Sequence, residues 1–198
     1  MRSVHGTVLS TTVAILLTLS LLPSGGLAAG PATAPSTMTV VGNPAPDFSL
    51  KDIKGNELKL SDLTQKGPVV LIQLRGWVGY QCPICTRQFG DFITHRDALD
   101  AAGAQVVFVY PGPALGLEDH AKDFISGKGL PASFHFLLDP DLVFVNAYGL
   151  RWDKKGETAY PSTFVIDRKG IFQFVKISHS HGDRATTAEV LNVLKGLK

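Results

Sequence analysis

Cysteine is scarce in this sequence of 198 residues, which contains only Cys82 and Cys85. A disulfide stabilises a fold mainly by closing a long loop, so two cysteines this close together cannot hold a domain together. Two thiols also fall short of the four ligands of a structural zinc ion, which would have to recruit histidines. An inert disulfide and a zinc site stay open as alternatives, but the pattern favours a chemical role for the pair.

Charge is also sparse and nearly balanced. Charged residues make up 18% of the chain, and the formal net charge is +2. This balance gives no reason to expect nucleic acid or an anionic membrane surface as a partner. The length and the 44% of hydrophobic residues fit one α/β domain with a short appendage.

The first 29 residues have the layout of a secretory signal peptide. Arg2 precedes an acid-free apolar run at Val8–Leu22, and small residues follow at Ala28 and Ala29, where we expect cleavage. The alternative is an uncleaved membrane anchor, for which the run is short. We therefore expect a periplasmic or extracellular protein, in contact with a membrane only if this segment stays attached. Residues 30–40 are predicted to be a flexible leader, and residues 41–198 to be the folded domain.

Apolar patterning predicts strands that alternate with helices. A continuous aliphatic run at Pro68–Leu74 is typical of a strand buried on both faces, and helical spacing follows over Pro83–Ala102. This order indicates an α/β sandwich in three layers, with a mixed central sheet flanked by helices, as in thioredoxin-like folds. The other expected elements are a hairpin at Asp52–Lys59, strands at Val106–Tyr110, Phe134–Leu138, Thr163–Asp167 and Ile171–Ile177, and helices at Leu115–Ser126, Asp141–Tyr148 and Arg184–Leu197.

The two cysteines lie in the segment Cys82-Pro83-Ile84-Cys85, where a buried strand gives way to a helix. Pro83 suits the first helical turn, which places Cys82 at the N-cap. The free N–H groups and the helix dipole there favour a thiolate. Cys85 follows one turn later, within reach of Cys82. An activated thiol with a resolving partner is what both disulfide exchange and peroxide reduction require.

Several longer segments resemble one known family. They are GNPAPDFSLKDIKGNELKLSDL, PVVLIQLRGWVGYQCPIC, LLDPDLVFVNAYGL and YPSTFVIDRKGIFQF, and together they resemble the AhpC/TSA group of peroxiredoxin relatives over residues 41–197. The resemblance implies a thioredoxin-like fold and a thiol-based antioxidant enzyme without a bound cofactor or metal. It makes Cys82 the peroxidatic thiol and Cys85 the resolving thiol, with an external thioredoxin-like thiol as reductant.

The chain departs from the family pattern Pro-x-x-x-Thr/Ser-x-x-Cys at two positions. Arg75 stands at the proline position, and Gly79 at the position of the hydroxyl that hydrogen-bonds the peroxide. Pro161, in Tyr160-Pro161-Ser162, stands where many peroxiredoxins carry an arginine. It resembles the cis-proline that faces the cysteines of thioredoxins and binds a substrate's extended backbone, although it also suits the start of a strand.

Three further side chains are candidates for supporting roles. Arg75 is expected to stabilise the Cys82 thiolate electrostatically. Trp77 and Tyr80 are expected to cover the cysteines or to form a docking lip for a partner protein. His179 and His181 are expected in the turn before the last helix, with Asp183 as its N-cap, rather than in a metal site.

Three functions follow. The first is an exported peroxiredoxin-like enzyme that reduces peroxides. The second is a thiol-disulfide oxidoreductase that acts on exported proteins, and the third is a redox-silent binding module.

Overall fold

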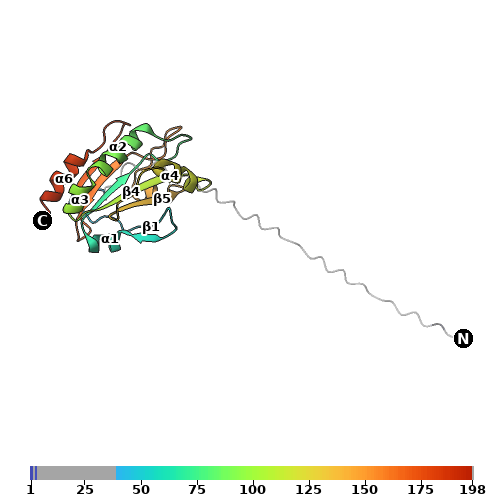
Figure 1. Cartoon of the computed structure of the whole chain (residues 1–198). Coiled ribbons are helices and arrows are strands. Elements are labelled where there is room, and N and C mark those ends of the chain that lie inside the picture. The colour runs from blue at the N-terminus through green and yellow to red at the C-terminus, as the bar shows by residue number, and fades with distance from the viewer. Residues whose placement is uncertain (2, 4–38, 198) are drawn as a thin grey trace. The chain divides into compact units, whose positions relative to one another are not determined.

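The computed structural model describes residues 1, 3 and 39–197. Apart from residues 1 and 3, the predicted signal peptide therefore lies outside the described residues, as does nearly all of the predicted leader. Within the described part of the chain, no helix is long and apolar enough to cross a membrane. Residues 39–197 form one mixed sheet with helices on both of its faces (Figure 1).

The sheet has seven strands in the order β2-β1-β5-β4-β3-β6-β7. The three central strands β3, β4 and β5 are parallel to one another, and all the other pairings are antiparallel. This confirms the predicted α/β architecture with a mixed sheet. The strands are β1 Ser49–Asp52, β2 Glu57–Lys59, β3 Val69–Gln73, β4 Gln105–Gly112, β5 Phe134–Pro140, β6 Ser162–Ile166 and β7 Phe172–Ile177.

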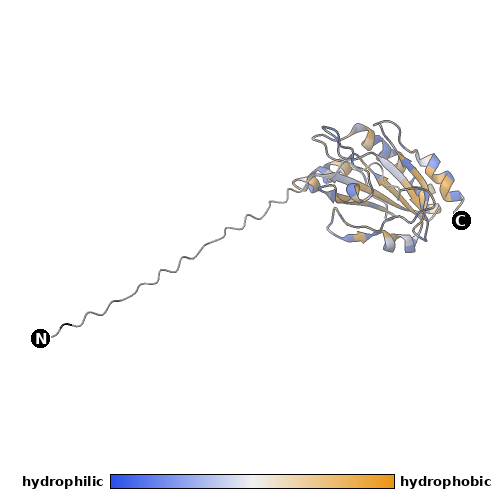
Figure 2. Ribbon diagram, turned by 180° about the vertical axis from the view of Figure 1, so that it is seen from behind, coloured by the Kyte–Doolittle hydropathy of each residue, from blue (hydrophilic) through white to orange (hydrophobic). Residues whose placement is uncertain are grey.

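Strand β3 is buried along its whole length because helices cover both faces of the sheet. Side chains of a strand alternate between the faces, so β3 contributes to two separate cores. One core lies beneath α2 (Pro83–Thr94), α3 (Arg96–Ala101), α4 (Leu117–Ile125) and α6 (Thr187–Lys195). The other lies beneath α1 (Leu60–Lys66) and α5 (Val143–Ala147). The hydropathy colouring shows apolar segments along the strands inside the fold (Figure 2).

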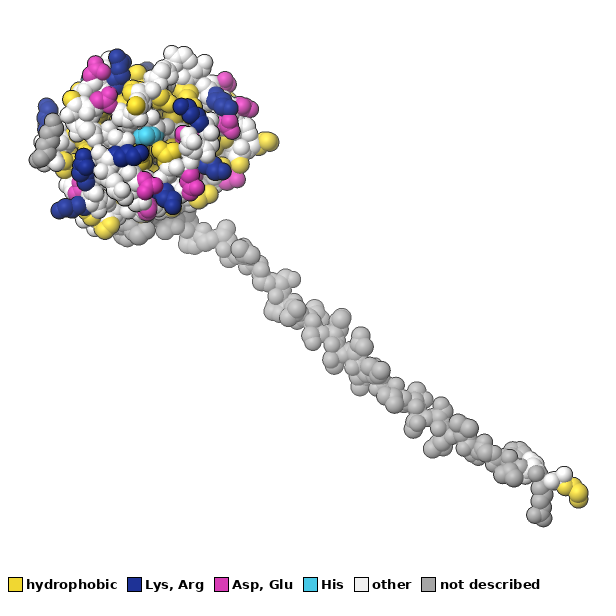
Figure 3. Space-filling view, turned by 60° about the horizontal axis from the view of Figure 1, so that its bottom comes forward, with side chains coloured by type: hydrophobic (Ala, Val, Ile, Leu, Met, Phe, Trp, Pro, Cys, Tyr) yellow, Lys and Arg dark blue, Asp and Glu magenta, His cyan; other side chains and the backbone are white. Residues whose placement is uncertain are grey.

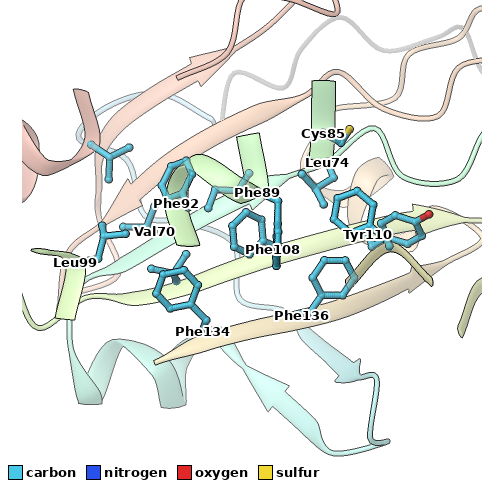
Figure 4. Close-up of a cluster of buried hydrophobic side chains, with 14 of the residues drawn as sticks. Val70, Leu74, Cys85, Phe89, Phe92, Leu99, Phe108, Tyr110, Phe134 and Phe136 are labelled. Atoms are coloured by element: carbon cyan, nitrogen blue, oxygen red, sulfur yellow. The ribbon is translucent and has the colours of Figure 1, made fainter. Parts of the chain in front are cut away.

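Aromatic rings dominate the first core. The ring of Phe89 on α2 lies 4.8 Å from that of Phe108 on β4 and 6.0 Å from that of Phe136 on β5. Edge-on and tilted aromatic pairs at such distances add to the energy of burial. Cys85 lies at one end of this cluster, near Leu74 and Tyr110 (Figure 4). The helix that carries the cysteines is therefore anchored to the sheet by its buried face. On the face that Figure 3 displays, basic and acidic side chains are interspersed.

Two helix boundaries differ from the sequence-based expectation. The helix expected over 83–102 is two helices that meet at His95, whose φ of −99° and ψ of 15° are not helical. His95 bonds back to the carbonyl of Asp91 with both its backbone N–H and its ring Nδ1, which closes the last turn of α2. The last helix begins at Thr187 rather than near Arg184. Its N-cap is Thr186, in a capping box with Glu189, so the prediction of Asp183 as the cap was wrong.

Asp139 is a buried carboxylate at the end of β5 that starts the next helix. It accepts the backbone N–H groups of Phe144 at 2.8 Å and Val145 at 3.0 Å. Burial raises the pKa of this carboxyl group, against the opposing effect of those hydrogen bonds. Without it, the first N–H groups of α5 would be buried with no acceptor.

We expect Asp139→Ala to lower the free energy of unfolding by about 1–3 kcal/mol, the usual effect of leaving buried donors unsatisfied. Urea denaturation measures this. The control is Asp153→Ala, which removes an exposed carboxylate and should change stability by less than about 0.5 kcal/mol. Equal effects of the two substitutions would contradict the assigned role of Asp139.

Candidate active site

Cys82 is held at the beginning of α2. Strand β3 ends at Gln73, a loop follows, and Cys82 takes an extended conformation as the N-cap, with Pro83 in the first turn as predicted. Its Sγ accepts the backbone N–H of Cys85 at 3.4 Å. Cys82 is 3% exposed and Cys85 is fully buried, and both are free thiols. Cys82 is therefore the thiol nearer to solvent, and Cys85 lies behind it.

The two thiols are driven to opposite protonation states. The hydrogen bond from the Cys85 thiol, helped by the backbone N–H groups of Cys85 and Ile84 and by the charge of Arg184, lowers the pKa of Cys82 to about 5 against burial. Burial raises the pKa of Cys85 well above its ordinary value, and the hydrogen bond to Cys82 adds to this effect. At neutral pH the pair thus holds one thiolate, on Cys82, and one proton, on Cys85.

Arg184 supplies the positive charge beside this thiolate. Its Nη2 lies 3.9 Å from Sγ of Cys82, while Nη1 donates to Gln88 at 3.0 Å and Nε to the carbonyl of His181 at 3.0 Å. Sequence reasoning did not select Arg184, which lies in the connection between β7 and α6. Its position beside Cys82 arises only because that connection passes next to the start of α2.

The guanidinium of Arg75, which was expected to face the thiolate, is engaged elsewhere. It pairs with Glu157 at 2.5 Å and donates to the hydroxyl of Tyr80 at 2.7 Å and to the carbonyl of Gly156 at 2.8 Å. The hydroxyl of Thr158 donates to the backbone carbonyl of Arg75. These contacts bind the loop before Cys82 to the segment 156–158, so the structure assigns Arg75 a positioning role for that loop.

Trp77 and Tyr80 occupy different sides of this loop. The ring of Trp77 is stacked on His120, with centroids 3.5 Å apart, and lines a cleft of about 620 Å³ whose walls contain neither cysteine. Tyr80 is 51% exposed beside Arg75. Between Arg75 and Trp77 the chain needs Gly76, where φ is +72° and a Cβ would lie 2.0 Å from the carbonyl oxygen of Pro111. The loop is thus pressed against the end of β4.

The side-chain amide of Gln81, immediately before Cys82, forms hydrogen bonds through both its oxygen and its nitrogen. Its Oε1 accepts the hydroxyl of Tyr110 at 2.7 Å, and its Nε2 donates to the carbonyl of His120 at 2.7 Å. Burial raises the pKa of Tyr110, so that the hydroxyl keeps its proton and remains a donor. Gln81 and Tyr110 are positioning residues that sequence reasoning missed. A polar residue next to the cysteines was the only available signal.

Pro161 lies at the same end of the sheet as the cysteines, because β6 begins at Ser162 opposite Gln73 of β3. The expectation of a cis bond there was wrong, since every peptide bond in the described residues is trans. The carbonyl of Pro161 accepts the N–H of Ser178 at 2.8 Å. The β6–β7 pairing therefore continues past Ser162 and uses the backbone carbonyl of Pro161.

The two histidines follow β7, which ends at Ile177, as the turn prediction required. His181 bonds through Nε2 to Glu157 at 2.9 Å, and the ring of His179 lies 4.8 Å from that of Tyr160. In the part of the chain that the structure describes, no three metal-ligating side chains come together. His181 thus links the connection that carries Arg184 to the Glu157–Arg75 pair.

The AhpC/TSA family profile matches residues 41–175, most of the chain. The chain belongs to the AhpC/TSA family. This confirms the resemblance stated from the sequence, and the family and its relatives support a thiol-based oxidoreductase.

The curated relatives of this chain include proteins named thiol-disulfide oxidoreductase and proteins named peroxiredoxin. A thiol-disulfide oxidoreductase ResA of Geobacillus kaustophilus is 33% identical over 135 residues, which cover 68% of this chain and 67% of the relative. A putative peroxiredoxin of Mycobacterium tuberculosis is 31% identical over 140 residues, which cover 68% of this chain and 83% of the relative. Both names support thiol redox chemistry, but one indicates a disulfide substrate and the other a peroxide substrate.

Solved structures agree on the fold. The crystal structure of peroxidoxin BcpB from Mycobacterium tuberculosis superposes with a TM-score of 0.63 at 23% identity, covering 80% of this chain and 97% of that one. A yeast mitochondrial 1-Cys peroxiredoxin gives a TM-score of 0.64 at 20% identity, covering 81% and 76%. The thioredoxin-like fold predicted from the order of elements is therefore confirmed.

The lowered pKa of Cys82 predicts a specific pH profile of alkylation. Only the thiolate reacts, so the rate of Cys82 modification by iodoacetamide should rise through a midpoint near pH 5 and be level at neutral pH, whereas a free thiol has its midpoint near pH 8.5. Mass spectrometry assigns the modified cysteine.

Arg184→Gln should move this midpoint upward, because it removes the positive charge next to Sγ. The matched control is Arg87→Gln on the exposed face of α2, which should leave the midpoint unchanged. A wild-type midpoint near pH 8.5 would contradict the assignment of the thiolate to Cys82.

Proposed function

We propose that this chain is an exported peroxidase in which Cys82 attacks the peroxide and Cys85 resolves the product. The observation that carries the proposal is the pairing of a Cys82 thiolate with a protonated Cys85 one helical turn away. Peroxide reduction needs a nucleophilic thiolate first and a second thiol afterwards. This pair supplies both in that order.

The reaction balances with these two thiols and an external reductant. The Cys82 thiolate attacks one peroxide oxygen, the O–O bond breaks, and the other oxygen leaves as an alcohol or water after taking up a proton. The resulting Cys82 sulfenic acid condenses with the Cys85 thiol, which releases water and forms a disulfide. Two electrons from an external thiol then restore the reduced pair.

Arg184 supports this proposal because it stands beside Sγ of Cys82, where the charge of the attacking thiolate and of the leaving oxygen is located. In peroxiredoxins an arginine is expected at the position of Pro161. Here the guanidinium comes from the β7–α6 connection instead. A charge-assisted donor at this point stabilises the thiolate and remains available to a developing negative charge on oxygen.

Thiol-disulfide exchange with exported proteins is the second candidate. The observation that favours it is Gly79, which leaves the position of the peroxide-binding hydroxyl without a side chain. The relatives named thiol-disulfide oxidoreductase ResA, and a thiol:disulfide interchange protein DsbE of Allochromatium vinosum that is 29% identical over 163 residues, support it as well. A redox-silent binding module has no use for the polarised thiol pair.

The reaction of the reduced Cys85→Ser protein with hydrogen peroxide distinguishes the peroxidase function from thiol-disulfide exchange. Sulfenic acid on Cys82 is trapped and measured by mass spectrometry. At pH 7 only a few per cent of a free cysteine is ionised, so full ionisation alone makes Cys82 roughly 30-fold faster than free cysteine. The peroxidase proposal predicts an acceleration well above this factor.

Cys82→Ser provides the control and should form no sulfenic acid. An acceleration of 30-fold or less, together with rapid reduction of a protein disulfide by the wild type, would favour the second candidate. If neither accelerated sulfenic acid formation nor reduction of a protein disulfide is observed, a redox-silent binding module is favoured.

Export is part of the proposal and rests on residues 1–29. We propose cleavage after Ala28 or Ala29, with residues 30–40 as a leader and residues 41–198 as the redox domain. The protein recovered from the periplasm or medium of a secreting bacterial host should have the mass of the chain without residues 1–28 or 1–29. The full-length mass in the membrane fraction would indicate an uncleaved anchor.

A further inference from the structure

A second cleft follows the outer face of α2; its walls contain neither cysteine, but they include Arg184, whose Nη2 lies 3.9 Å from Sγ of Cys82. It has a volume of about 380 Å³ and lies between that face and the segment 182–188. Ile84 and Arg184 line the part nearest Cys82, Gln88 and Ala185 are buried in its walls, and Arg87 is exposed at its side. The cleft is therefore open to solvent and has the size of a small-molecule site.

The cleft is positively charged near the cysteines. Among residues 39–197, no ion pair joins Arg87 or Arg184 to a carboxylate. The one carboxylate in the lining, Asp91, accepts the backbone N–H and the hydroxyl of Thr187 and pairs with His95. In this part of the chain no carboxylate neutralises either arginine, although Arg184 donates hydrogen bonds to Gln88 and to the carbonyl of His181.

The charge balance of this cleft changes with the redox state of the cysteines. In the reduced protein the Cys82 thiolate compensates Arg184 across 3.9 Å. When Cys82 and Cys85 form a disulfide, that negative charge is lost and Arg184 stays half-buried without a counter-charge. A half-buried guanidinium of this kind favours an anion within reach, and a carboxylate matches its geometry.

We propose that this cleft binds the reductant of the oxidised enzyme, and that the reductant is a small thiol carrying a carboxylate. The carboxylate pairs with Arg184 and Arg87 and places the sulfur at Cys82, the less buried of the two cysteines. This inference rests on the proposed catalytic cycle, in which the disulfide must be reduced by an external thiol, and it names the chemical class of that thiol.

The reduction balances with two molecules of the thiol. The thiolate of the first attacks Sγ of Cys82, the Cys82–Cys85 bond breaks, and Cys85 leaves and takes up a proton. A second thiolate attacks the reductant's sulfur in the mixed disulfide and releases Cys82 as a thiolate and the reductant as its disulfide. The returning thiolate again compensates Arg184, so the oxidised product loses affinity and departs.

Three thiols of similar size but different charge test this proposal on the oxidised full-length protein. They are 3-mercaptopropionate, 2-mercaptoethanol and cysteamine, which carry a negative, a neutral and a positive substituent. The rate of disulfide reduction is measured by alkylation and mass spectrometry. Each rate is divided by the rate of the same thiol with bis(2-hydroxyethyl) disulfide, because thiols differ in pKa and nucleophilicity.

The normalised rate should fall from 3-mercaptopropionate to 2-mercaptoethanol to cysteamine. The anionic thiol should exceed the neutral one by about fivefold or more at low salt, and high salt should reduce the difference. Arg184→Gln should abolish most of this preference. Arg87→Gln should weaken the preference as well, because it removes one of the two positive charges that line the cleft.

Lys169→Gln is the matched control. It removes one positive charge from the turn between β6 and β7, at the opposite end of the sheet, and should leave the preference intact. Equal normalised rates for the three thiols, or a preference that survives in both arginine variants, would overturn the proposal. The assay contains no peroxide and no protein substrate, so its outcome is separate from that of the peroxidase test.

Discussion

The contact between Cys82 and Cys85 is the interaction on which the rest of the site depends. Cys85 is buried deeply enough to keep its thiol proton. As a hydrogen-bond donor, Cys85 stabilises the thiolate of Cys82, which lies at the N-terminus of α2. This asymmetry gives one nucleophile and one resolving thiol from two chemically identical side chains. It needs a helix whose buried face is fixed, which the aromatic core beneath α2 provides.

Two connections far apart in the sequence hold this pair in place. Arg75 and Glu157 bind the loop before Cys82 to the segment 156–158, and Glu157 also holds His181. The carbonyl of His181 in turn accepts Arg184, whose guanidinium reaches Cys82. A continuous series of polar contacts therefore links the loop before Cys82 to Arg184, the member of the series that approaches the sulfur. Charge from outside the helix adds to the helix end itself in stabilising the thiolate.

The sequence was sufficient for the fold and for the two thiols. These predictions rested on local sequence patterns: a continuous β-branched run, a proline after Cys82 and helical spacing. Each of these patterns depends on interactions between residues close together in the chain. Arg184 was missed since its approach to Cys82 depends on how the β7–α6 connection passes α2, which no local pattern encodes. Thr186 is different, because the spacing Thr186-x-x-Glu189 is a capping box that was present in the sequence. Pro161 was misjudged from an analogy, since its peptide bond is trans and its carbonyl continues the pairing of β6 with β7.

The central claim is that reduced Cys82 is a thiolate at neutral pH while Cys85 is not. The thiolate absorbs near 240 nm, so a pH titration of the reduced wild type against Cys82→Ser and Cys85→Ser measures it directly. We expect one thiolate per chain to appear with a midpoint near pH 5 in the wild type, and this step to be missing in Cys82→Ser. An absorbance that rises only above about pH 8, as in a free thiol, would contradict it.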